Sequence, residues 1–146
     1  MTPTITNRKA SFRFHLSDRF EAGLVLTGSE VKSLRLGRAN LVDAYAVIHN
    51  GALWLLNCHI NPYEAASYNN HEPTRSRKLL LHAHEIERLG AKIKERGLTL
   101  VPLRLYFNAR GIVKCELALA KGKAEFDKRE SIKKRETDRL MRRALK

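Results

Sequence analysis

Alternating apolar and polar positions run from Phe12 to Ala120 and predict a mostly antiparallel β protein. The clearest element covers residues 41–60, where two apolar-rich runs flank Asn50-Gly51. That dipeptide favours the positive φ angles of a two-residue hairpin turn. A second hairpin is expected across Asn-Ala-Arg-Gly, with Val101, Leu103, Leu105 and Phe107 alternating against Val113, Cys115, Leu117 and Leu119. Pro102 indicates an edge or a bulge in it.

Two segments have helical spacing instead. After a strand at 20–28, residues 29–37 have Ser29 as a candidate N-cap and a glycine at the end. After an extended run at 78–84, residues 85–97 place apolar side chains on one helical face and also end at a glycine. We therefore expect a mainly β fold with flanking helices, in which the strands form a small closed barrel because closure removes exposed edges.

The charge of the chain points to a polyanionic partner. Its 146 residues include 28 Lys and Arg against 15 Asp and Glu, a net charge of +13. Residues 127–146 carry +5 and residues 1–126 carry +8, so we expect one basic domain followed by a basic tail. Such a chain usually binds nucleic acid. A membrane is a weaker candidate, since no segment is long and apolar enough to insert.

Two further features favour a cytoplasmic location. Cys58 and Cys115 each lie alone in an apolar run, as expected for core thiols in a reducing compartment. The N-terminus has no apolar signal segment.

The tail has helical periodicity but little to bury. Plotted as a helix, one stripe contains Lys128, Arg135, Arg139, Arg142 and Lys146. Stacked like charges repel, and phosphates would remove that repulsion. One interpretation is a segment that is disordered alone and helical on RNA. The other is an ordinary solvated run of charge.

Evidence for catalysis is sparse. His82 and His84 would point the same way on a strand and could share a metal ion with Glu85, but no further ligand cluster follows at a recognisable spacing. Phe12 and Phe14 lie among basic residues and could stack on bases or begin the core. A metal-dependent enzyme acting on RNA is therefore a minor alternative to an RNA-binding protein.

Six segments, in order, resemble motifs of one family: NRKA, FEAGLVLTGSEVKSLRLGRANLVDAY, HINPY, PTRSRKLLLH, GLTLVPLRLYF and AKGKAEFDKRESIK. From Asn7 to Arg135 the chain is similar to the SsrA-binding protein (small protein B) family. The resemblance implies an oligonucleotide-binding-type barrel with flanking helices and a non-catalytic function without a cofactor.

The resemblance also implies partners. Members bind the tRNA-like domain of transfer-messenger RNA and promote its entry into stalled ribosomes for trans-translation. Elongation factor Tu and alanyl-tRNA synthetase act on the same RNA, and a monomer is expected. The alternative is a general ribosomal or RNA-chaperone protein, which has similar composition but not these ordered motifs.

Carried over by motif, the family's RNA-contact cluster falls on Glu21, Leu80 and Lys114, and Asn7 matches a family position near the RNA. Lys32 and Arg35 are expected to face the RNA as well. A carboxylate such as Glu21 can accept from a guanine edge, Lys114 can neutralise phosphate, and Leu80 can pack on a base unless it belongs to the core.

The family's tail enters the decoding region of the small ribosomal subunit. Matching positions are Gly122, Asp127, Lys128 and Arg129, with the basic stripe beyond them. Many members have an aromatic residue where this chain has Thr137, and the tail here is shorter.

Overall fold

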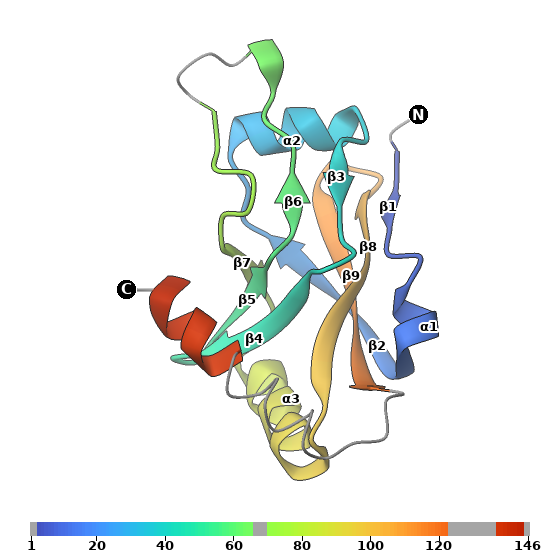
Figure 1. The fold of residues 1–146 in the computed structure, drawn as a ribbon, viewed down its shortest axis with the longest axis vertical. Coiled ribbons are helices and arrows are strands. Elements are labelled where there is room, and N and C mark those ends of the chain that lie inside the picture. Colours follow the sequence, from blue (N-terminus) through green and yellow to red (C-terminus); the bar gives the residue numbers. More distant parts are fainter. Residues whose placement is uncertain (1–2, 66–69, 123–136, 145–146) are drawn as a thin grey trace.

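The computed structural model describes residues 3–65, 70–122 and 137–144 of the chain (Figure 1). The elements in order are β1 (Ile5–Thr6), α1 (Ala10–Arg13), β2 (Phe14–Leu24), α2 (Gly28–Arg35), β3 (Ala39–Asn40), β4 (Tyr45–His49), β5 (Ala52–Leu56), β6 (His59–Ile60), β7 (Arg77–Leu80), α3 (Ala83–Arg96), β8 (Thr99–Phe107) and β9 (Val113–Gly122). A last helix, which we call the C-terminal helix, covers 137–144.

The strands form a ring of antiparallel pairs. The order β1-β8-β4-β5-β7-β2-β9 returns on itself because β9 also pairs with β8. The ring is held firmly along β9, which has long ladders to both β2 and β8, and most lightly between β4 and β8, where one residue pair is in register. The expected mainly β architecture with flanking helices is confirmed.

The core lies inside this ring, and helices cover its two ends (Figure 1). Fully buried leucines come from strands on every side, including Leu53, Leu79, Leu100 and Leu117. Leu34 of α2 and Leu89 of α3 join the same apolar cluster from opposite ends. Burying these helix faces inside the ring leaves the outer faces of the strands for other contacts.

Both hairpins form where the sequence predicted them. Asn50 and Gly51 have φ angles of 51° and 75°, as a tight hairpin turn requires. In the second hairpin Pro102 lies at a bulge, because Pro102 pairs with Leu117 while Arg104 pairs with Glu116. The bulge breaks the expected alternation. Val101 and Leu103 pack in a second, smaller cluster with Ala10, Ala118 and Ala120, away from Leu105.

Three element boundaries differ from prediction. The strand expected at 20–28 is the end of β2, which begins at Phe14 and stops at Leu24. Thr27, rather than Ser29, is the N-cap of α2, and its backbone N–H donates to Glu30 at 2.8 Å. The strand expected at 78–84 ends at Leu80, since α3 already begins at Ala83. In α2 the capping box of Thr27 and Glu30 sets the start, whereas α3 begins after His82 without a side-chain cap.

Candidate nucleic-acid interface

Strand register places four residues in one row across the outside of the ring, and two of them are predicted RNA contacts, Leu80 and Lys114. Gly23 of β2 pairs with Leu80 of β7 on one side and with Lys114 of β9 on the other. Lys114 in turn pairs with Tyr106 of β8. Residues directly opposite one another in adjacent strands point to the same face of a sheet. An apolar side chain, a glycine, an ammonium group and a phenol therefore share this face.

A second, more polar row runs beside the first. Glu21 lies two residues before Gly23 and so on the same face of β2. It pairs with Glu116 of β9, which pairs with Arg104 of β8. Arg104 donates to Glu116 at 3.4 Å. We call the seven residues of the two rows the outer cluster: Glu21, Gly23, Leu80, Arg104, Tyr106, Lys114 and Glu116.

Tyr106 connects the two rows. Its hydroxyl donates a hydrogen bond to the Glu21 carboxylate, and the Arg104 guanidinium lies 4.4 Å from its ring centroid. Desolvation, and after it the bond and charge of Glu21, raise the pKa of Tyr106 to about 12. The phenol is thus neutral at physiological pH and orients the carboxylate, which keeps free lone pairs for an incoming N–H group.

Leu80 is a surface residue and not part of the core. Its side chain is 50% exposed, while its neighbour Leu79 is 1% exposed. Gly23 makes room for it, because a Cβ added at Gly23 would lie 3.2 Å from the Cβ of Leu80. An exposed leucine beside Lys114 and a carboxylate offers an apolar platform next to polar groups, which suits an unpaired base.

Helix α2 presents Lys32 and Arg35 at one end of the ring. Both are exposed, and each cation lies over an aromatic ring, Lys32 at 5.6 Å from Tyr63 and Arg35 at 6.0 Å from Phe107. Phe107 packs against the core at the end of β8, so Arg35 lies over this end of the ring, whereas Lys32 extends toward the segment that contains Tyr63.

A buried ion network fixes α2 in this position. Glu30 and Arg77 are both fully buried and hydrogen-bonded to each other. Arg75 donates to Glu30 at 2.6 Å, and Arg77 also donates to the Cys58 carbonyl at 2.6 Å. Burial alone would raise the pKa of Glu30, but the bonds from Arg75 and Thr27 and the charge of Arg77 hold it below its ordinary value.

The N-terminal segment contributes differently from what its sequence suggested. The Asn7 amide donates to the Pro102 carbonyl at 3.0 Å, so this side chain fastens the N-terminus to β8 and is not directed into the outer cluster. Phe14 packs against the second apolar cluster, as a core residue would. Phe12 is 81% exposed, which keeps the base-stacking interpretation open for that ring.

The histidine motif does not have the geometry of a metal site. His84 lies in the first turn of α3, so the strand alternation assumed for His82 and His84 is wrong. Their rings stack with centroids 5.7 Å apart. Among the described residues no three His, Cys, Asp or Glu side chains converge on a common point.

The tail is described only in part. Gly122 ends β9, and Arg139 and Arg142 are exposed on the C-terminal helix. Asp127, Lys128, Arg129, Arg135 and Lys146 lie outside the described residues. One expectation is wrong for the described part: the tail does bury a side chain of its own, because Met141 is only 3% exposed.

Reasoning from sequence missed Tyr106, Arg104, Glu116 and Gly23. Tyr106 and Arg104 are the polar members of the alternating run in β8, and Glu116 occupies the same place in β9. Their alternation with buried leucines was the available signal, since it places them on the outer face with Lys114.

Comparisons with known proteins agree with this arrangement. The model of the SmpB protein family matches residues 4–146. The SsrA-binding protein of Symbiobacterium thermophilum is 59% identical over 144 residues, which cover 99% of this chain and 91% of that protein. That of Syntrophobacter fumaroxidans is 59% identical and covers 96% of this chain and 86% of that protein.

A solved structure has the same fold. It is described in the words "tmRNA-SmpB: a journey to the center of the bacterial ribosome". Its sequence is 46% identical to this chain, and the TM-score is 0.73. The alignment covers 99% of both chains. Within the described ranges, no helix has the length and apolar character needed to cross a membrane.

Proposed function

Because the chain belongs to the SmpB protein family, we propose that it binds transfer-messenger RNA and promotes its entry into stalled ribosomes for trans-translation. The observation that carries this proposal is the outer cluster, in which register brings together the matched residues Glu21, Leu80 and Lys114. These three residues are distant in sequence and come from three different strands, so only the folded ring brings them together.

The chemistry of the cluster suits the tRNA-like domain, where unpaired bases are available. Leu80 packs on a base, the Glu21 carboxylate accepts from the N–H edge of a guanine, and Lys114 pairs with phosphate. Lys32 and Arg35 extend the basic surface toward the end of the ring, and Asn7 acts by holding the N-terminal segment in place.

The proposal assigns different roles to two parts of the chain. Residues 1–126 form the RNA-binding body, which we assign to the oligonucleotide-binding type of barrel. Residues 127–146 form the tail, which engages the small-subunit decoding region through Asp127, Lys128, Arg129 and the basic stripe, and Gly122 contributes from the end of β9. The ring, which is complete by Gly122, supports this division, because no strand of it comes from the described part of the tail.

The remaining features of the proposal concern partners. The protein acts in the cytoplasm as a monomer without catalysis, while elongation factor Tu and alanyl-tRNA synthetase bind the same RNA. Cys58 and Cys115 are fully buried and form no disulfide. Free thiols of this kind support the proposed location in a reducing compartment.

Two matched pairs of variants test recognition. Glu21→Ala and Lys114→Ala are compared with Glu87→Ala and Lys94→Ala, which change the same charges on the exposed face of α3. We expect Glu21→Ala to weaken binding to the tRNA-like domain by about tenfold or more, because one specific base contact contributes about 1–3 kcal/mol. Lys114→Ala should weaken binding to both RNAs and reduce the salt dependence by about one counterion, because Lys114 pairs with phosphate. The α3 variants change only the long-range electrostatic attraction between the protein and RNA, so we expect a small effect on affinity.

Titration against the tRNA-like domain and an ordinary tRNA, at several salt concentrations, distinguishes the alternatives. A preference for the tRNA-like domain that persists at high salt supports the proposal. Equal affinities that fall steeply with salt for both RNAs indicate phosphate binding alone, and the protein would then be a general ribosomal or RNA-chaperone protein. Tagging assays with residues 127–146 deleted test the tail, for which we expect loss of tagging with RNA binding retained.

A further inference from the structure

The hairpin formed by β4 and β5 is apolar on both of its faces. Toward the inside, Leu53 and Leu55 are fully buried in the core. Toward the outside, Tyr45 pairs with Leu56 and Val47 pairs with Trp54. We call these four residues the outer hairpin face. Leu56 is only 4% exposed although it belongs to neither apolar cluster of the described residues, so something else covers this face.

The C-terminal helix covers it. The Tyr45 hydroxyl is buried without a hydrogen-bond partner of normal geometry among the described residues. Burial raises the pKa of Tyr45, and the Thr137 side chain of the helix lowers it to a smaller extent. Met141, one helical turn further on, is 3% exposed. Residues four apart lie on the same face of a helix, so Thr137 and Met141 turn together toward the hairpin. Figure 1 shows this helix beside β4 and β5.

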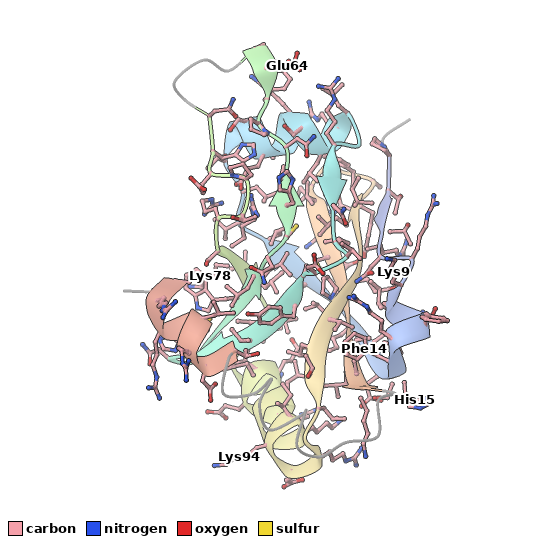
Figure 2. The ribbon with its side chains drawn as sticks, in the orientation of Figure 1. Lys9, Phe14, His15, Glu64, Lys78 and Lys94 are labelled. Carbon is pink, nitrogen blue, oxygen red and sulfur yellow. The ribbon has the colours of Figure 1, made fainter. Side chains whose placement is uncertain are left out.

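The other sides of the helix remain in solvent. Arg139, Arg142 and Arg143 are exposed, and on the hairpin side Lys78 of β7 pairs with Trp54 and is exposed too. Figure 2 labels Lys78 next to this helix. Two basic surfaces therefore meet around an apolar contact, and their repulsion weakens it. Repulsion of this kind favours exchange of the apolar contact for contacts with phosphate.

We propose that the outer hairpin face is a docking surface for the chain's own C-terminal helix, which holds the tail on the body until RNA displaces it. The docking itself is a property of the free protein. The displacement step rests on the proposed function, because it assumes that the tail acts in the ribosome. Release would expose Met141 for contacts there and free the outer hairpin face at the same moment.

Trp54 reports on docking directly, since it is the single tryptophan of the chain and lies on the outer hairpin face. In Met141→Glu we expect its fluorescence to shift to longer wavelength and its quenching by acrylamide to increase. Leu140→Glu is the matched control, because it adds the same charge at a neighbouring side chain that is already 44% exposed. Circular dichroism melts of both variants verify that the body is folded.

An unchanged spectrum in Met141→Glu overturns the docking, whatever the protein does with RNA. Salt gives a second criterion: docking persists at high salt, because screening reduces the repulsion, whereas RNA binding weakens. A Trp54 signal that moves toward the Met141→Glu spectrum as salt rises contradicts an apolar contact.

Val47→Lys tests the displacement step with an unaltered tail. The added cation faces the basic helix and is expected to release it, again with a shift in Trp54 emission. In a reconstituted tagging assay we expect faster tagging than for the wild-type chain. A Trp54 shift without faster tagging overturns displacement as a required step. Absence of tagging by the wild-type chain itself contradicts the proposed function, and fluorescence still decides whether the helix docks.

Discussion

Replacing Glu30 by alanine removes the centre of the buried ion network beneath α2. The Glu30 carboxylate accepts from Arg77, from Arg75 at 2.6 Å and from the Thr27 backbone at 2.8 Å. Arg77 is fully buried. After the substitution its guanidinium keeps carbonyl acceptors on Cys58 and Pro73 but has no anion to balance its charge. A buried charge without a partner is among the most destabilising defects in a folded protein.

The expected loss is large. Breaking one partner of a buried ion pair costs about 3–5 kcal/mol, out of a total unfolding free energy of about 5–15 kcal/mol. For a chain of this size that lowers the melting temperature by roughly 10 °C. Arg75→Ala is the matched comparison, since it removes a bond to the same carboxylate from a side chain that is 34% exposed. It should cost about 1 kcal/mol, because solvent screens that pair.

A double-mutant cycle by urea unfolding measures the effect. The cycle compares Glu30→Leu, Arg77→Met and both substitutions together. Glu30→Leu leaves Arg77 buried without an anion, Arg77→Met leaves Glu30 paired only with Arg75, and the double variant removes both buried charges. We expect the double variant to be more stable than the sum of the two single losses predicts, with coupling of about 2 kcal/mol or more. Additive losses, or a cost below 1 kcal/mol for Glu30→Ala, would refute the assignment of a coupled buried pair.

Acid supplies an independent check on the same network. The pKa of Glu30 is lower in the folded chain than in the unfolded chain, so its contribution to stability is fully present above the unfolded pKa of about 4.3. It is lost as pH falls through the lower, folded pKa. Glu30→Gln should flatten the loss of stability in this acid range relative to the wild-type chain, and an identical acid profile would contradict the pKa shift.

Three further predictions concern single sites. Gly90→Ala, within α3, should stabilise the fold by about 0.5–1 kcal/mol, because alanine is the better helix former and its Cβ would meet Ile48 at an ordinary 3.6 Å; a lower urea midpoint would contradict this. Gly23→Val should displace Leu80 and weaken RNA binding, and unchanged affinity would show that the position of Leu80 is unimportant. Burial raises the pKa of Cys58 to about 11 and that of Cys115 still further, so neither thiol should react with a disulfide reagent at pH 8 until the chain unfolds. The stability that the neutral thiols contribute is present below their ordinary pKa of about 8.5 and declines as the pH rises toward the folded pKa values. Comparing the free energy of unfolding at pH 7 and at pH 10 measures this decline.

Local chemistry made parts of the fold predictable. Asn50-Gly51 determines its own turn, because few other residue pairs adopt positive φ at both positions without strain. Gly97 likewise ends α3 with a φ of 63°. Pro102 indicated its bulge correctly, but the consequence, that Leu103 changes sides, depends on how β9 pairs across it.

The outer cluster was predictable only in pieces. Lys-Leu-Leu-Leu at 78–81 has no apolar alternation, so its sequence cannot show which leucine faces outward; the pairing of Leu80 with Gly23 decides it. Glu21 and Tyr106 are 85 residues apart, and only the closure of β9 onto both β2 and β8 brings them within hydrogen-bonding distance. Long-range register of this kind follows from the whole ring and not from any window of sequence.

The hairpin of β4 and β5 shows how a run of sequence can carry information about a distant segment. A strand that covers a core on one side and meets water on the other should alternate between apolar and polar residues. This hairpin instead has Tyr45, Val47, Trp54 and Leu56 on the side away from the core. Apolar residues on both faces require two apolar partners, and the core supplies only one. The second partner is the C-terminal helix, which buries Met141 although it belongs to a strongly basic tail.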